Sequence, residues 1–97
     1  MTAPAAPLDI HHEPSSHRFV VLTSGGEAVL EYDTVDAKTL DYYHTFVPAA
    51  SRGGGVASQL AEFALRYALD KGLKVRPTCP FVARYLQRHP EFQPLVV

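Results

Sequence analysis

Three consecutive glycines, Gly53 to Gly55, separate a strand-like run from a long helix-like run, and this junction constrains the fold more than any other feature. Glycine at a helix start costs backbone entropy, so a triple glycine indicates a close approach to the backbone that no side chain would allow. The first amides of a helix lack intrahelical partners, and the helix dipole adds partial positive charge there. The stretch SRGGGVAS therefore predicts either a tight turn or an anion-binding loop with Arg52 at its rim.

The chain before the glycines predicts antiparallel strands. Three β-rich runs occupy residues 18–23, 28–33 and 38–48. Gly25 and Gly26, between the first two runs, fit a tight hairpin turn in which both residues take a positive φ angle. Alternation in the third run predicts one shared face for Leu40, Tyr42, His44 and Phe46. We therefore expect His44 to share a face with aromatic side chains.

The chain after the glycines predicts a helix, a strand and a second helix. Apolar residues at i, i+3 and i+4 spacing indicate an amphipathic helix over residues 56–72, which Gly72 ends. A short buried strand over 73–77 and a helix over 79–90 follow. Crossover connections are right-handed and join parallel strands, so the last two strands should pair in parallel. The expected fold class is α/β: a mixed sheet, two main helices and the glycine loop at the sheet edge where ligands bind.

The length and charge limit the domain count and the classes of partner. With 97 residues, the chain can form one modest core, and we expect a disordered leader over residues 1–8 and a single domain over 9–97. Residues 10–17 fit a loop or a short edge segment, and the tail after Pro90 is too short to assign. A net charge of −1 gives no case for nucleic acid or an anionic membrane surface.

Apolar runs and possible metal ligands are also informative. No run is long enough to span a bilayer and the first ten residues do not resemble a signal peptide, so we expect a cytoplasmic protein. His11 and His12 have no third ligand at a suitable spacing, which favours solvated side chains over a metal site. Cys79 is the single cysteine, so an internal disulfide and a Cys-rich zinc site are excluded.

The spacing around the glycines excludes two common phosphate-binding loops. A Walker loop needs Lys-Ser or Lys-Thr after the last glycine, where this chain has Val56 and Ala57. A dinucleotide-binding loop needs a third glycine at the position of Ser58. The pattern that does fit, Arg52-x-x-Gly55-x-Ala57, resembles the R/Q-x-x-G-x-G/A pyrophosphate loop of the GNAT superfamily of acetyl-CoA-dependent N-acetyltransferases.

The resemblance extends over about residues 9–95. A strand with His-Thr, the glycine loop, and a Pro-x-Cys-x-Phe-Val segment followed by His-Pro are similar to small single-domain GNAT-like proteins of the YjdJ type. The resemblance implies that the parallel strand pair splays apart to admit the pantetheine arm of acetyl-CoA, while the loop amides hold its pyrophosphate. It implies as cofactor-binding residues Phe46, Val47, Arg52, Gly53, Gly54, Gly55, Val56 and Ala57, with Arg84 either on a solvated helix face or near a CoA phosphate.

Three residues are candidates for the chemistry of acetyl transfer, which needs a neutral amine, a stabilised oxyanion and a proton for the leaving thiolate. Cys79 falls at the start of the second helix, where the dipole favours a thiolate that takes the acetyl group or a thiol that donates the proton; it is equally a small buried thiol. His44 fits a general base, because imidazole titrates near neutrality, or a group holding the backbone. Tyr85 fits the acid that related enzymes supply from this helix, or a core aromatic.

The residues and the resemblance leave two functions open. One is an N-acetyltransferase that passes the acetyl group of acetyl-CoA to an unknown amine, a small molecule or a protein lysine, directly or through Cys79. The other is a non-catalytic acyl-CoA-binding or regulatory module with a degenerate acceptor site. The amino-terminal helices that shape the acceptor site in typical GNAT domains have no counterpart here, so the acceptor does not follow from the resemblance. A plain protein-interaction domain is the least favoured interpretation.

Overall fold

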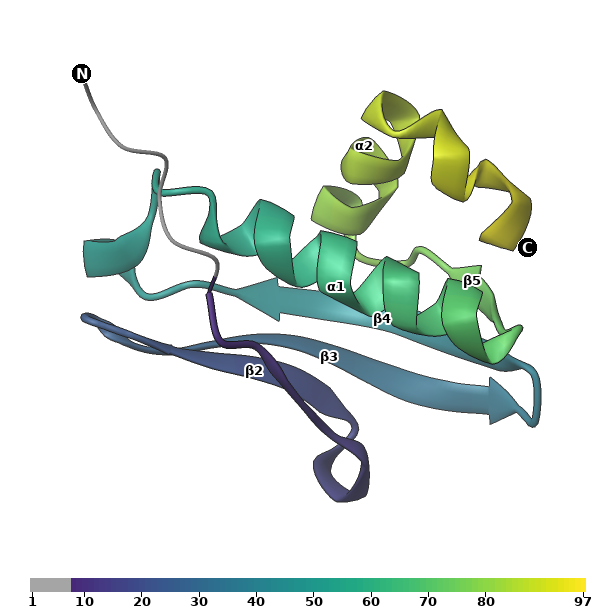
Figure 1. Cartoon of the computed structure of the whole chain (residues 1–97), viewed down its shortest axis with the longest axis horizontal. Helices are drawn as coiled ribbons and strands as arrows, with labels where there is room; N and C mark the ends of the chain where they lie inside the picture. Colours follow the sequence, from purple (N-terminus) through teal and green to yellow (C-terminus); the bar gives the residue numbers. More distant parts are fainter. Residues whose placement is uncertain (1–7) are drawn as a thin grey trace.

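The computed structural model describes residues 8–97 (Figure 1). The predicted leader therefore lies outside the described residues, except for its last residue, Leu8. The amide of Leu8 donates a hydrogen bond to Oε1 of Gln59 at 3.1 Å, and the Leu8 side chain packs against the core. Leu8, the last residue of the predicted leader, therefore packs against the domain.

A five-stranded mixed sheet in the order β1-β2-β3-β4-β5 organises the chain. The strands are β1 (His11–Glu13), β2 (Arg18–Thr23), β3 (Gly26–Asp36), β4 (Thr39–Phe46) and β5 (Lys74–Arg76). The first four strands pair antiparallel, and β4 pairs with β5 in parallel. The predicted α/β class and parallel pair are confirmed, and the short edge segment is strand β1.

Two helices bury residues against one face of this sheet. Helix α1 (Val56–Lys71) connects β4 to β5 and ends at Gly72 in the left-handed conformation, as its sequence predicted. Helix α2 (Pro80–Arg88) follows β5, and in Figure 1 α1 runs between α2 and the strands β2 and β3. The tail forms a 3-10 segment, Pro90–Leu95, which adds Phe92 and Leu95 to the core. The sheet face opposite α1 is covered by neither helix.

Tyr42 ties the sheet to α1. Its side chain is fully buried, and its hydroxyl donates a hydrogen bond to the carbonyl of Ala64 at 2.6 Å. Burial raises the pKa of Tyr42 well above its ordinary value, so the hydroxyl stays protonated and remains a donor. This bond satisfies a polar group that would otherwise be stranded in an apolar core.

A β-bulge at Tyr43 overturns the predicted alternation of β4. Tyr42 pairs with Tyr32 and His44 pairs with Glu31, which leaves Tyr43 without a partner on β3. One extra residue reverses the faces of the residues that follow it. Thr45 consequently faces the helices, and the expectation that His44 shares the face of Tyr42 is wrong.

The β2–β3 hairpin forms as predicted, but its two glycines differ in role. Only Gly26 has a positive φ, at +124°, so the expectation of two positive φ angles is wrong. At Gly25, close neighbours exclude a side chain: a Cβ there would lie 2.9 Å from Oγ of Ser51 and 3.0 Å from Cβ of Ala50. The turn thus packs directly against the segment that leads into the glycine loop.

The parallel pair of β4 and β5 opens before β4 ends. Pairing stops at Asp41 and Arg76, although β4 continues to Phe46. The last backbone bond across the gap runs from the amide of Cys79 to the carbonyl of Tyr42, at 2.9 Å. The strand edge beyond Tyr42 therefore diverges from β5 toward the start of α1, which is the splay that the resemblance implied.

Candidate functional site

A cavity of about 460 Å³ lies where β4 diverges from β5. Four parts of the chain line it: the end of β4 with the residue after it, the loop before α1, the first turn of α1, and the first turn of α2. Its lining residues are Thr45, Phe46, Val47, Ser51, Arg52, Gly53, Gly55, Val56, Ala57, Ser58 and Phe81. The cavity therefore combines a strand edge with a helix N-terminus.

The glycines of the loop leave this cavity open. Gly53 and Gly55 have φ angles of +87° and +81°, a region that L-residues with side chains rarely adopt. A Cβ on either residue would meet no atom within 4 Å, so the space beside the backbone is empty. The positive φ angles favour glycine at both positions, and the open space beside them leaves room for a ligand.

Within residues 8–97, the backbone amides of this loop have no acceptor. Among the described residues, no hydrogen bond is recorded from the backbone amides of residues 53–58, and the first bond of α1 is donated by the amide of Gln59 to the carbonyl of Gly55. No side chain caps the helix at Gly55. A run of free amides at a positive helix end is a binding surface for an anionic group.

The loop is anchored from the hairpin side. Oγ of Ser51 donates to Oγ1 of Thr23 at 2.7 Å and accepts from the amide of Gly25 at 3.1 Å. These bonds hold the segment Ala49–Ser51 against the β2–β3 turn. Local sequence patterns do not predict this support, because the Ser51–Thr23 hydrogen bond links residues 28 positions apart.

Arg52 lies across the strand end. Its Nε donates a hydrogen bond to the carbonyl of Val47 at 2.9 Å, and its side chain is exposed. The carbonyl of Val47, one of the residues that the resemblance implies for cofactor binding, thus already has one donor. A carbonyl oxygen has two lone pairs, so it can accept a second hydrogen bond from a ligand.

Cys79 is the N-cap residue of α2 and is 5% exposed. Its Sγ lies 3.4 Å from Oγ1 of Thr45, which lines the cavity. The amide of Cys79 is fixed by the carbonyl of Tyr42. The thiol is therefore held next to the cavity wall by a backbone bond and a hydroxyl neighbour.

The other predicted site residues lie elsewhere. His44 is exposed on the sheet face opposite α1, and it does not line the cavity. Tyr85 is buried and stacks on His89 with ring centroids 3.9 Å apart. Burial, then the charges of Glu62 and Glu91, raise the pKa of Tyr85. Arg84 is exposed and is not part of the cavity lining.

The cavity also includes residues that the sequence analysis did not propose. Thr45 belonged to the His-Thr pair of the resemblance, and Phe81 to its Pro-x-Cys-x-Phe-Val segment, so both had a signal. Ser51 and Ser58 flank the loop and were treated only as its boundaries. Gly54, by contrast, was proposed but is absent from the lining residues of this cavity.

Among residues 8–97, no group of three or more His, Cys, Asp or Glu side chains is arranged to hold a metal ion. No helix in that part of the chain is both long and apolar enough to cross a membrane.

A mixed sheet whose parallel pair opens at a glycine-rich helix start defines an α/β protein with the N-acetyltransferase fold. The chain belongs to the GCN5-related N-acetyl-transferase family, whose model matches residues 18–95. It is 35% identical to the protein NATD1 of Xenopus tropicalis over 89 residues, which cover 90% of this chain and 82% of that protein. It is also 35% identical to human NATD1 over 86 residues, covering 87% and 76% of the two chains.

A solved structure supports the fold independently. The solution NMR structure of a GCN5-like protein from Staphylococcus aureus superimposes with a TM-score of 0.68, covering 96% of this chain and 91% of that one. The two sequences are 20% identical. At that identity, the comparison establishes the shared fold.

Proposed function

We propose that this protein binds acetyl-CoA in the cavity beside β4 and transfers its acetyl group to an amine acceptor in the cytoplasm. The observation that carries the proposal is the cavity itself, where the edge of β4 meets the open glycine loop. Family membership supports the same ligand, because the loop lies within the matched residues and resembles the family's pyrophosphate loop.

The loop residues fit a pyrophosphate. The amides of residues 53–57, which have no acceptor recorded within residues 8–97, lie at the positive end of α1, and the open space beside Gly53 and Gly55 leaves room for a phosphate group. Arg52 adds a guanidinium at the rim, and charge-assisted bonds to phosphate are stronger than its bond to the neutral carbonyl of Val47. Arg52 thus has a reason to exchange partners on binding.

The strand edge fits an extended amide-containing arm. Phe46 and Val47 line the cavity beyond the point where β5 pairs with β4. An unpaired strand edge presents backbone donors and acceptors to an added strand-like ligand. The pantetheine arm is such a ligand, and bound acetyl-CoA would supply an activated thioester.

Cys79 has two chemical roles open to it. In direct transfer, the amine forms the amide bond and the carbon–sulfur bond of the thioester breaks. The Cys79 thiol donates a proton to the leaving thiolate, and the proton released by the amine restores the Cys79 thiol. In covalent transfer, the Cys79 thiolate attacks the thioester and expels the CoA thiolate, and the amine then takes the acetyl group from Cys79; the proton lost by the amine neutralises the departing CoA thiolate, and Cys79 is restored as a thiolate. The contact with Thr45 places the thiol near the cavity for either role.

A non-catalytic acyl-CoA-binding module is the second candidate. Two observations favour it: His44 lies outside the cavity lining, and Tyr85 is buried in the core rather than at the cavity. Neither residue is in contact with the cavity in the free protein. This candidate shares the cofactor site and differs only in turnover.

Calorimetry with CoA tests the cofactor site. We expect wild type to bind CoA and Gly55→Glu to lose binding, because the new side chain fills the space beside the loop and adds a like charge. Gly72→Glu is the matched control: Gly72 has a φ of +69° with nothing within 4 Å, at the other end of α1. Absence of CoA binding by wild type, or equal loss in both variants, would remove the proposed function.

Turnover separates the two candidates. Wild type should acetylate members of a panel of amines and lysine peptides, and intact-mass analysis tests for an acetyl adduct that Cys79→Ala lacks. Acetylated product without a detectable adduct favours direct transfer. CoA binding with no product from any acceptor favours the binding module.

A further inference from the structure

The sheet face opposite α1 carries an apolar row at the end nearest the cavity. Val20 pairs with Val29, and Val29 pairs with Phe46, so the three side chains lie side by side across β2, β3 and β4. Leu22, two residues after Val20, is 78% exposed, and Phe46 is 45% exposed. Phe46 also lines the cavity, so this open face begins where the cavity ends.

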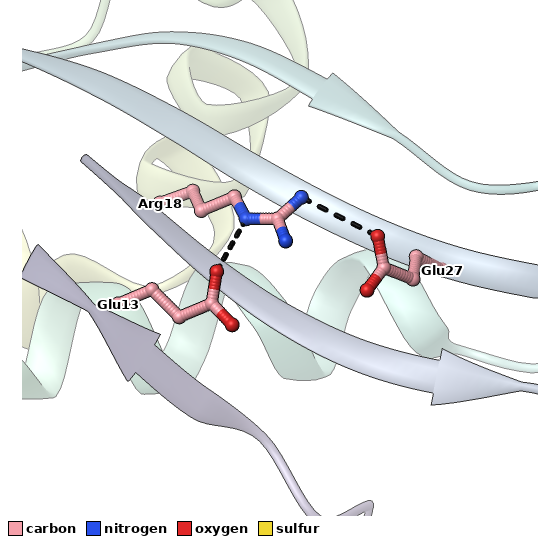
Figure 2. A network of polar contacts seen from close by, with 3 residues as sticks. All are labelled: Glu13, Arg18 and Glu27. Atoms are coloured by element: carbon pink, nitrogen blue, oxygen red, sulfur yellow. Dashed lines mark hydrogen bonds and ion pairs between the residues drawn. The ribbon is translucent and has the colours of Figure 1, made fainter. Parts of the chain in front are cut away.

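Arg18 lies in the next row of this face, beside Glu31, and its guanidinium already has two carboxylate partners. Nε of Arg18 donates to Glu13 at 2.6 Å, and its Nη1 donates to Glu27 at 3.4 Å (Figure 2). The pKa of Arg18 is raised by these bonds, so the guanidinium stays charged. One arginine between two carboxylates leaves an excess of negative charge.

Three further carboxylates on this face have no ion pair recorded among residues 8–97: Glu31, Asp33 and Asp41. Asp33 pairs with Asp41 across β3 and β4, and Arg76 is the register partner of Asp41 on β5 without an ion pair between them. Oδ1 of Asp41 is buried and has no hydrogen-bond partner in the described part of the chain. A buried carboxylate oxygen with no donor is an acceptor in need of one.

The bulge places an aromatic ring among these carboxylates. Tyr43 is 41% exposed, and its pKa is raised by desolvation and then by the charges of Glu31 and Asp33. His44, next to Tyr43, pairs with Glu31 on the same face. The open face therefore combines exposed aromatic and aliphatic side chains with unpaired negative charge.

We propose that this open face is the docking surface for a basic polypeptide, which presents a lysine amine to the cavity past Phe46. The inference rests on the proposed function, because it names the acceptor of that same site. Charge complementarity selects the partner, because its lysine ammonium groups would pair with the carboxylates of Glu31, Asp33 and Asp41. The aliphatic parts of those lysines, and apolar residues next to them, would pack on Tyr43, Phe46 and Leu22. A second copy of this chain would set the same carboxylates against each other, and nucleic acid would be repelled.

Binding of a synthetic peptide of alternating lysine and alanine, measured by fluorescence anisotropy at low salt, tests the surface without requiring turnover. We expect wild type to bind it, and Glu31→Gln combined with Asp33→Asn to weaken binding roughly threefold to tenfold, because each exposed charge pair contributes modestly. The matched control, Glu62→Gln with Asp70→Asn, removes the same charge from α1 and should bind like wild type. Amide shifts on peptide addition should cluster at Leu22, Glu31, Tyr43 and Phe46.

The docking surface is rejected if the peptide does not bind wild type, if a glutamate–alanine peptide binds equally well, or if the α1 control loses as much affinity. Amide shifts confined to α1, or self-association of the protein through the open face, would also reject it. Calorimetry with CoA on the same variants distinguishes the two proposals. Retained CoA binding without peptide binding rejects the docking surface alone, whereas absence of CoA binding by wild type rejects the proposed function.

Discussion

Sγ of Cys79 lies 3.4 Å from Oγ1 of Thr45, and this contact joins the start of α2 to the strand that borders the cavity. It exists because the bulge at Tyr43 turns Thr45 toward the helices. Without the bulge, His44 would face Cys79 and Thr45 would face away. The bulge therefore determines which side chain accompanies the thiol.

Thr45→Val should slow acetylation of Cys79 about threefold to tenfold while leaving the fold intact, because it removes a hydroxyl contact and keeps the branched shape. The rate of adduct formation is measured by intact mass after addition of acetyl-CoA. Thr78→Val, at the exposed residue before Cys79, is the matched control and should react like wild type. An unchanged rate in Thr45→Val would show that the hydroxyl does not position the thiol.

Gly25→Ala should destabilise the domain by about 1–3 kcal/mol, the usual range for an overpacked contact. The added methyl would lie 2.9 Å from Oγ of Ser51 and 3.0 Å from Cβ of Ala50, so the segment leading to the glycine loop must shift. Affinity for CoA should fall with stability. Urea unfolding and calorimetry measure both quantities.

Ser24→Ala is the control for that experiment. Ser24 is exposed in the same turn, and no side-chain hydrogen bond is recorded for it in the described part of the chain. Its substitution should change the free energy of unfolding by less than about 0.5 kcal/mol. Equal stability of Gly25→Ala and Ser24→Ala would mean that the hairpin does not support the loop.

Much of the fold could be predicted from local patterns. The i, i+3, i+4 spacing before Gly72 fixed α1, and Pro80 and Pro90 bounded α2 to within a residue or two. The parallel pairing of β4 and β5 followed from the handedness of crossovers. These features depend on residues close together in sequence or on chain geometry.

The rest depended on packing between distant segments. Alternation in β4 gave no sign that Tyr43 would be the extra residue, because a bulge is decided by how β4 pairs with β3. Gly25 looked like a residue for positive φ, whereas its smallness serves the contact with Ser51. Thr45 went unnamed because the same alternation assigned it to the other face. The wrong expectations for His44, Thr45 and Gly25 thus all come from contacts between segments that lie far apart in the sequence.

Tyr42→Phe should cost about 1 kcal/mol of the free energy of unfolding, the usual value of one buried hydrogen bond. The substitution keeps the ring and removes the donor to the carbonyl of Ala64. Tyr43→Phe, the same change at the exposed neighbour, should stay within about 0.5 kcal/mol of wild type. Urea unfolding compares the two; equal costs would show that the bond to α1 adds no net stability.

His12 should make the domain less stable as the pH falls below about 6.5, the ordinary value for imidazole. The His12 ring stacks on Phe19 with the ring centroids 4.5 Å apart, and its Nε2 lies 2.7 Å from the hydroxyl oxygen of Tyr32. Burial, and then the charge of Lys71, lower the pKa of His12 in the folded protein. Below about pH 6.5 the unfolded chain therefore binds more protons than the folded one, so the free energy of unfolding falls until the pH drops below the folded pKa.

Urea unfolding from about pH 7.5 to about pH 5.5 measures this dependence, to which one proton contributes at most about 1.4 kcal/mol per pH unit. His12→Gln should flatten the curve in this window, even though it lowers stability at neutral pH by removing the stacked ring. Lys71→Met keeps the imidazole and removes the cation that opposes its protonation, so its curve should fall between those of wild type and His12→Gln. If His12→Gln retained the wild-type slope, the pH dependence would have to arise from other groups and His12 would not be its source.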